Sequence, residues 1–174
     1  MQGYKIIRVD RTDHYGGILM WIHNSIQISD FRTSRPEDKN QYILVNTFTI
    51  TIIGMYIPPN QLRTTEDIKN ILTKAKHQRK IIAGDFNTPP PQNVTFSNIN
   101  YQYPIITLLE EINMFCINDK RYIHIGNWYQ RNTIPDLTFL SENLMLDYAW
   151  EIIQDTLGSD HIPIILMIQN SNLQ

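Results

Sequence analysis

Residues 81–87 place a carboxylate and a carboxamide directly after a short apolar run. Asp85 and Asn87 follow two isoleucines and a glycine, and they lie two positions apart, so in an extended chain they point to the same side. A carboxylate beside a neutral amide can bind a hydrated divalent cation and a phosphate oxygen together. The spacing therefore predicts a phosphate site at the end of a strand. The alternative is an ordinary Asp-Phe-Asn turn after a core strand, ahead of the proline run at 89–91.

Three other stretches carry polar side chains where an apolar run begins or ends. Asp160 and His161 stand directly before the apolar run 162–168, and Asp136 opens a strand-like stretch. Tyr56 ends an alternating run and precedes two prolines. Four predicted strand ends thus carry a phenol, a carboxylate with an amide, a second carboxylate, and a carboxylate with an imidazole. Structural roles stay open, since Tyr56 could cover the edge of the core and Asp160 could cap a turn.

A mostly β chain with inserted helices must position these strand ends. Residues 4–9 and 18–22 predict a hairpin, and 41–56 predict two strands, in which Phe48, Ile50 and Ile52 face one way and the intervening threonines the other. The charged stretch 30–40 contains a proline and predicts a loop. Further strands are expected at 81–84, 136–140, 150–153 and 162–168.

Two helices are expected between these strands. The first follows Thr64, a capping residue, and the second follows Pro104. Their apolar positions recur at helical spacing and are interpreted as core. The expected stripes are Ile68, Ile71, Leu72 and Ala75 in the first helix, and Ile105, Leu108, Leu109 and Ile112 in the second.

Length and composition favour one intracellular domain. A chain of 174 residues with 42% hydrophobic content can bury one sizeable core, and the composition does not change along it, so residues 1–174 are read as a single domain. The single cysteine, Cys116, excludes a disulfide within the chain and is interpreted as a core residue. No apolar run approaches the ~20 residues that cross a bilayer, so no membrane partner is expected.

The charge of the chain is not that of a strongly basic nucleic-acid binder. The formal net charge is −2, whereas Lys and Arg contacts to phosphate supply most non-specific affinity for DNA. Any basic surface must therefore be local. The clearest cluster is Lys74, Lys76, His77, Arg79 and Lys80. At the end of a predicted helix, such charges more simply favour the negative pole of the helix dipole.

In order along the chain, these motifs resemble the endonuclease/exonuclease/phosphatase superfamily, and most closely the endonuclease domain of non-LTR retrotransposons. The resemblance covers nearly the whole chain. It rests on Gly3-Tyr4, Asp10-Arg11, Gly16-Gly17, Tyr56-Ile57-Pro58-Pro59-Asn60, Gly84-Asp85-Phe86-Asn87, Asp136-Leu137-Thr138-Phe139 and Ser159-Asp160-His161. It implies an α/β fold, a DNase I-like two-sheet β-sandwich flanked by helices.

The resemblance also implies a role for each matched site residue in magnesium-dependent phosphodiester hydrolysis, with manganese as a substitute ion. His161 would be the general base or would contact the phosphate, and Asp136 would orient it. Asp85 would position or deprotonate the attacking water, while Asn87 would hold a phosphate oxygen and Tyr56 would stabilise the phosphate. Asp160 would lie near the metal, with Asp85. The sequence leaves open which of Asp85 and His161 takes the proton.

Contacts to DNA are expected outside this set. The resemblance implies that Asn60 and Arg131 contact DNA and that Trp128 stacks on bases or inserts at a groove. The aromatic side chain could equally pack against the edge of the sandwich. A reverse transcriptase domain in a longer parent protein and a nuclear location also follow from the resemblance alone.

The N-terminus departs from the pattern. The resemblance implies a strand, a helix and a second strand ahead of Gly3-Tyr4, with the principal glutamate ligand of magnesium on the second strand. The sequence begins after these elements, so we expect the metal site to lack its main anchor and one sheet to lack interior strands.

Three functions are therefore open. The first is a nicking DNA endonuclease of a retroelement. The second is a catalytically weak or inactive remnant that at most binds nucleic acid, and the third is a phosphatase of the same superfamily.

A different fold, that of the two-metal phosphoesterases, is set aside. It needs an Asp-x-His motif upstream, whereas His14 is preceded two positions earlier by a threonine. It also needs further histidine ligands. His23, His77 and His124 do not stand in that context and are interpreted as surface or packing residues.

Overall fold

The computed structural model describes residues 2–13, 15–59, 65–87, 104–119, 121–126 and 132–169. Its centre is a six-stranded sheet with the strand order β3-β4-β5-β6-β8-β7. The strands β5 and β6 are parallel, and every other neighbouring pair is antiparallel. The members are β3 (Asp30–Thr33), β4 (Gln41–Asn46), β5 (Thr51–Tyr56), β6 (Lys80–Asp85), β7 (Met114–Cys116) and β8 (Asp136–Ser141).

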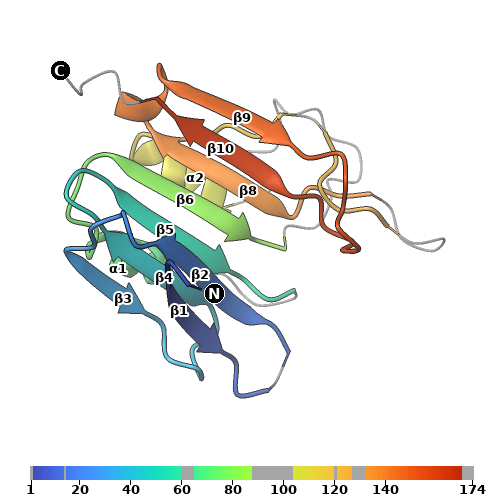
Figure 1. Cartoon of the computed structure of the whole chain (residues 1–174), viewed down its shortest axis with the longest axis horizontal. Helices are drawn as coiled ribbons and strands as arrows, with labels where there is room; N and C mark the ends of the chain where they lie inside the picture. Colours follow the sequence, from blue (N-terminus) through green and yellow to red (C-terminus); the bar gives the residue numbers. More distant parts are fainter. Residues whose placement is uncertain are drawn as a thin grey trace.

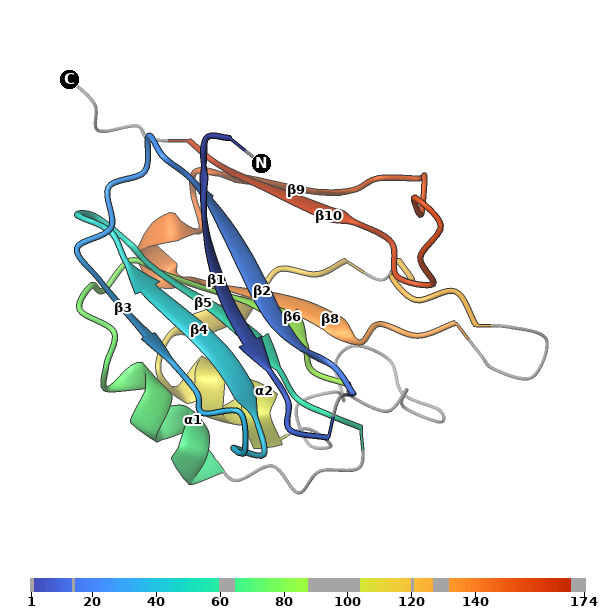
Figure 2. The same ribbon diagram turned by 60° about the horizontal axis from the view of Figure 1, so that its bottom comes forward.

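Two antiparallel hairpins cover one face of this sheet. They are β1 (Tyr4–Asp10) with β2 (Gly17–His23), and β9 (Tyr148–Ile152) with β10 (Ile164–Ile168). The helices α1 (Thr65–Leu72) and α2 (Pro104–Glu111) cover the opposite face (Figure 1, Figure 2). The predicted sandwich flanked by helices is thus confirmed. Among the described residues its second layer consists of two separate hairpins, with no ladder between them.

The strand β4 lies at the centre of the packing and is buried at all six positions. Alternate side chains enter different clusters because successive residues of a strand face opposite sides. Leu44 packs with the helices in the largest cluster, whereas Ile43 and Val45 pack under the β1–β2 hairpin. A third cluster, around Leu140, lies under the β9–β10 hairpin.

Four local expectations differ from the structure. The stretch 30–40 is not all loop, because β3 occupies Asp30–Thr33. The short strand β7 at Met114–Cys116 was not expected. Both helices end earlier than expected. The first ends at Leu72, before Ala75, and the second ends at Glu111, before Ile112, which is 44% exposed.

The expected alternation at 47–52 is also wrong. Residues 47–50 form a turn, Phe48 is exposed, and β5 begins only at Thr51. Thr51 is fully buried, and its hydroxyl donates a 2.6 Å hydrogen bond to Oδ1 of Asn46, which offsets the cost of burying a polar group. The expectation that the threonines occupy the wetter face therefore fails at Thr51, where a hydrogen-bonded hydroxyl is buried.

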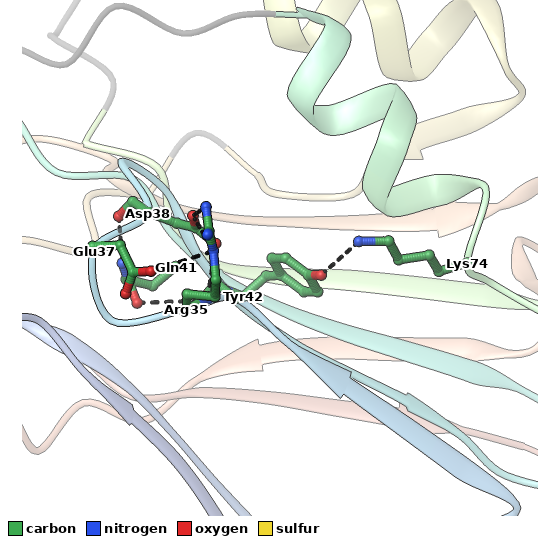
Figure 3. A network of polar contacts seen from close by, with 7 residues as sticks. Arg35, Glu37, Asp38, Gln41, Tyr42 and Lys74 are labelled. Carbon is green, nitrogen blue, oxygen red and sulfur yellow. Dashed lines mark hydrogen bonds and ion pairs between the residues drawn. The ribbon is translucent and has the colours of Figure 1, made fainter.

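A polar network connects the turn before β4 to the segment that follows α1 (Figure 3). Arg35 donates to Asp38, and the side chain of Gln41 donates a 2.6 Å bond to the carbonyl of Asp38. Lys74 Nζ donates a 2.9 Å bond to the hydroxyl of Tyr42.

No helix among the described residues has the length and apolar content needed to cross a membrane.

Candidate active site

Three of the predicted site residues end adjacent strands in direct register. Tyr56 on β5 pairs with Asp85 on β6, and Asp85 pairs with Asp136 on β8. The carboxyl ends of the parallel strands β5 and β6 therefore meet the amino end of the antiparallel strand β8. The sheet alone brings a phenol and two carboxylates into one row, and all three side chains are partly exposed.

Glycines make this row possible. Gly84 has a φ of +149°, and a Cβ there would overlap the carbonyl oxygen of Met55 on the neighbouring strand. Gly16 has a φ of +81°, and a Cβ there would lie 2.6 Å from the ring of Tyr56. Any larger residue at these two positions would displace β5 from β6 or push the phenol out of place.

His161 joins the row through Asp136. Its Nδ1 lies 2.7 Å from Oδ2 of Asp136. An ionised carboxylate only accepts, so Nδ1 carries the proton and Nε2 is left for a substrate or an ion. Burial lowers the pKa of His161, but the hydrogen bond and charge of Asp136, with the charges of Asp85 and Asp160, raise it above 6.5 overall. The imidazole is thus biased towards its charged form.

The surroundings of Asp85 favour its uncharged form, in contrast to those of His161. Its burial raises the pKa of the carboxyl above 3.8, and the nearby Asp136 carboxylate raises it further. Hydrogen bonds from Asn87 oppose this rise, since the backbone N–H donates to Oδ1 at 2.9 Å and the side-chain amide donates to Oδ2 at 2.8 Å. Asp85 is therefore a more basic carboxylate than an exposed one.

Asn87 does not have the extended conformation that its spacing suggested. Its φ is +43°, in the left-handed region, so the chain turns directly after the strand. The turn directs the amide of Asn87 at Asp85 and at the carbonyl of Ile57, to which it donates a 3.1 Å bond. The simple turn that the sequence also allowed is correct for the backbone, and the amide supports the carboxylate.

Arg11 is a site residue to which sequence reasoning gave no role. Its side chain is only 13% exposed, donates to the carboxylate of Asp13, and donates a 3.2 Å bond to the carbonyl of Lys39. Burial and the charge of Asp85 raise the pKa of Tyr56, whereas the charge of Arg11 lowers it. The guanidinium is therefore close enough to act on the phenol. The Asp10-Arg11 motif was the available signal.

His124 was interpreted from the sequence as a surface or packing residue, but it lies beside His161. The segment 123–125 runs between residue 133 and residues 160–162, and its backbone bonds to both sides. The N–H of Ile125 donates a 2.9 Å bond to the carbonyl of Asp160, and the N–H of Ile162 donates a 2.6 Å bond to the carbonyl of Ile123. This ladder holds the His124 and His161 rings edge to face, with centroids 5.3 Å apart.

The site opens into a cleft of about 550 Å³ between β6, β8 and β10. Asp136 and His161 line it together with largely apolar neighbours, among them Ala83, Leu137, Ile164 and Leu166. Apolar walls lower the local dielectric constant and strengthen the charge interactions at its polar end.

The predicted DNA contacts Asn60, Trp128 and Arg131 lie outside the described residues. The basic cluster lies at the start of β6, and the site lies at the end of the same strand. Lys74 bonds to Tyr42, Lys76 lies 3.4 Å from Asp30, and the ring of His77 lies 2.9 Å from the carbonyl of Thr47. These contacts give three members of the cluster structural roles.

Solved structures of low sequence identity share the fold. The endonuclease domain of TRAS1, a telomere-specific non-LTR retrotransposon, has a TM-score of 0.70 at 16% identity, over 97% of this chain and 80% of that chain. A 3′ phosphatase from Neisseria bound to a product DNA hairpin has a TM-score of 0.71 at 13% identity, over 97% and 80%.

An AP endonuclease from Leishmania major has a TM-score of 0.66 at 12% identity, over 97% of this chain and 72% of that chain. At such identities these likenesses show the fold alone. The comparison with curated proteins gives no match.

One family is shown by the sequence itself. The family described as "Endonuclease-reverse transcriptase" matches residues 50–165, which include Tyr56, Asp85, Asp136 and His161. The chain therefore belongs to the endonuclease-reverse transcriptase family, within the endonuclease/exonuclease/phosphatase superfamily.

Proposed function

We propose that the chain is a DNA endonuclease of a non-LTR retroelement, which hydrolyses phosphodiester bonds with a divalent cation and leaves nicks. The single observation that carries this proposal is the Asp136–His161 pair, joined at 2.7 Å at the end of a row that also holds Asp85 and Tyr56. Such a row offers a base, donors for phosphate oxygens and acidic ligands side by side.

His161 acts on the phosphate. Because Asp136 fixes the proton on Nδ1 and favours the imidazolium, Nε2–H can donate to a non-bridging phosphate oxygen. Negative charge grows on these oxygens in the transition state, so a charged donor binds the transition state more tightly than the substrate.

Asp85 takes the proton from the attacking water. Its burial raises the pKa of the carboxyl, and a more basic carboxylate is a better general base. The two bonds from Asn87 hold the carboxylate in one orientation while it does so. Tyr56, beside Asp85 in the register, donates its hydroxyl to the phosphate, and Arg11 adds positive charge nearby.

The donors of the site fit a hard divalent cation. Mg²⁺ binds oxygen ligands and keeps several waters, so that one or two carboxylates together with substrate phosphate are enough. Asp160 is exposed and Asp85 is half-buried, and these two would hold the ion. The ion, Mg²⁺ or Mn²⁺, would supply charge neutralisation at the phosphate.

The choice of DNA as substrate, and of a reverse transcriptase domain as a partner in a longer protein, is supported by the family description and by the retrotransposon neighbour. The choice of endonuclease over phosphatase is supported by the same two findings. A phosphatase of similar fold is the competing assignment.

Nicking of supercoiled plasmid in Mg²⁺ tests the proposal. We expect nicking by the chain, loss of nicking in His161→Ala, and unchanged nicking in His23→Ala, because His23 is an exposed histidine on β2 outside the site. Equal nicking by both variants would contradict the proposal.

One further substrate and one extended variant of the protein separate the alternatives. Release of phosphate from a 3′-phosphorylated oligonucleotide, without nicking, would identify a phosphatase. Binding of the oligonucleotide with neither activity would identify an inactive remnant. A version preceded by a strand-helix-strand segment that regains nicking would show that this chain supplies site residues but an incomplete metal site.

A further inference from the structure

The side chains of His124, Asp160 and His161 form a cluster next to the Asp136–His161 pair. Each offers one ligand atom, and these atoms all lie within 4.8 Å of one another. In the part of the chain that the structure describes, no other group of three or more His, Cys, Asp or Glu side chains is this close.

We propose that this cluster is a binding site for a borderline-soft transition-metal ion of the Zn²⁺ class, distinct from the hard cation of the hydrolytic reaction. Two imidazoles and one carboxylate are a donor set that suits Zn²⁺, whereas Mg²⁺ prefers oxygen ligands throughout. Three protein ligands leave one position of a tetrahedral ion open to water.

The distances suit such an ion. Two ligands at 2.0–2.1 Å from a tetrahedral ion lie about 3.4 Å apart. His124 Nε2 and Asp160 Oδ2 are already 3.5 Å apart. The Asp160 side chain is 69% exposed and all three ligand atoms lie within 4.8 Å of one another, so modest side-chain rotations would bring them to this separation.

The backbone holds the two imidazoles in place. His124 and His161 face each other across an antiparallel bridge, flanked by the Ile125–Asp160 and Ile162–Ile123 bonds. Ligands on a bonded ladder stay close without the metal, so less ordering entropy opposes metal binding.

Asp136 gives His161 the hydrogen bond that metal-ligating histidines usually make through their other ring nitrogen. A metal-ligating histidine normally donates its other ring N–H to a carboxylate or a carbonyl. Asp136 accepts this bond from Nδ1, which leaves Nε2 as the ligand atom. His124 has no such acceptor among the described residues, because its buried Nδ1 has no hydrogen-bond partner. The site should therefore be weaker than a closed four-ligand zinc site.

Binding at this site would oppose hydrolysis, and this part rests on the proposed function. The ion would replace the proton on Nε2 of His161, which is released to solvent, and would occupy the atom that the proposal assigns to the phosphate. It also takes Asp160, an assigned ligand of the hard cation. Zn²⁺ would therefore inhibit the Mg²⁺-dependent reaction by occupying two of its groups.

The first experiment is Zn²⁺ titration of the metal-free protein, without DNA, by calorimetry and by competition with a chromophoric chelator. We expect one Zn²⁺ per chain, at least tenfold weaker binding in His124→Gln, and about 10–100-fold weaker binding in Asp136→Asn. Co²⁺ should give a visible absorption band that His124→Gln removes, and excess Mg²⁺ should not displace Zn²⁺.

His23→Gln is the matched control, since His23 is an exposed histidine outside the cluster. Asp160→Asn is a second variant in case His124→Gln fails to fold, because this exposed side chain is not needed for packing. Unchanged Zn²⁺ affinity in both cluster variants, or an equal loss in His23→Gln, would overturn the site.

The second experiment measures Zn²⁺ inhibition of nicking in Mg²⁺. We expect Zn²⁺ to lower the nicking rate of His124→Gln much less than that of the wild type, each compared with its own rate in Mg²⁺ alone. Failure of nicking in every form would count against the proposed function but would leave the titration valid. Zn²⁺ binding without inhibition would overturn the competition and keep the site.

Discussion

Asp136 and His161 are 25 positions apart in the chain, and their side chains meet at 2.7 Å. The carboxylate fixes the proton on Nδ1 and leaves Nε2 for another partner, and both residues line the cleft. The role of His161 therefore depends on a residue that need not touch the substrate.

The first prediction concerns the dependence of His161 on Asp136. Asp136→Asn should lower the rate of nicking by about 10²–10³-fold, because the charged donor loses its orientation and its charge partner. The His161 pKa, measured by NMR in the metal-free protein, should fall in the same variant. Asp10→Asn removes an exposed carboxylate that pairs with Arg8, outside the site, and should change neither. A normal nicking rate in Asp136→Asn, together with a lowered His161 pKa, would show that the Asp136–His161 pair is not needed for catalysis.

The second prediction concerns pH and stability. The folded-state pKa of His161 lies above its ordinary value of 6.5. The stabilisation is therefore complete below pH 6.5 and is lost as the pH rises through the higher folded-state value. Denaturant unfolding of the wild type and of His161→Gln should differ most at the acidic end of this window. A difference that grows as the pH rises would contradict the assigned direction.

The third prediction concerns Gly84. Gly84→Ala should destabilise the protein by at least about 2–3 kcal/mol, because the added methyl would overlap the Met55 carbonyl where φ is already unfavourable. Gly158→Ala is the control, since that glycine has a φ of +83° but nothing within 4 Å of the added carbon. It isolates the conformational cost, about 1–2 kcal/mol. Equal losses by thermal denaturation would mean that the close approach is unimportant.

The fourth prediction concerns Arg11. Arg11→Met should weaken binding of DNA and reduce the slope of log affinity against log salt by about one, as expected for one lost phosphate contact. Arg8→Met is a matched control, because Arg8 also pairs with an aspartate two residues on but is 66% exposed. Binding measured by fluorescence anisotropy should separate the two. The same small effect in both would remove Arg11 from the site.

The fifth prediction concerns Cys116. Burial raises the pKa of its thiol to about 11, so little thiolate is present at neutral pH. Iodoacetamide should label it slowly in the native protein and rapidly after denaturation, as followed by mass spectrometry. Rapid native labelling would show that β7 opens easily.

The strand ends were predictable because each carries a local signal. Gly84 breaks an apolar run before Asp85, and an imidazole precedes the run that becomes β10. The hairpin of β1 and β2 and both helices follow from periodicity in the same way. These features need only neighbours in sequence.

Features that depend on distant pairing were not predictable. The contact of His124 with Asp160 and His161 needs a backbone ladder across about 36 positions, and a single histidine between two isoleucines gives no hint of it. The sequence left open whether Asn87 continues the strand or enters a turn, and the left-handed φ of Asn87 decides for the turn. Arg11 acts on Tyr56 only because the β1–β2 hairpin folds over β5.

The two hairpins of the second layer also affect how the protein behaves when it is concentrated. Among the described residues each is a two-stranded sheet, so its outer backbone groups have no ladder partner. Tyr4, Ile6 and Trp21 are exposed on the β1–β2 hairpin. Unpaired strand edges beside exposed apolar side chains are templates for strands of other molecules. With a net charge of only −2, little repulsion opposes such contacts, so self-association should set the practical limit on solubility.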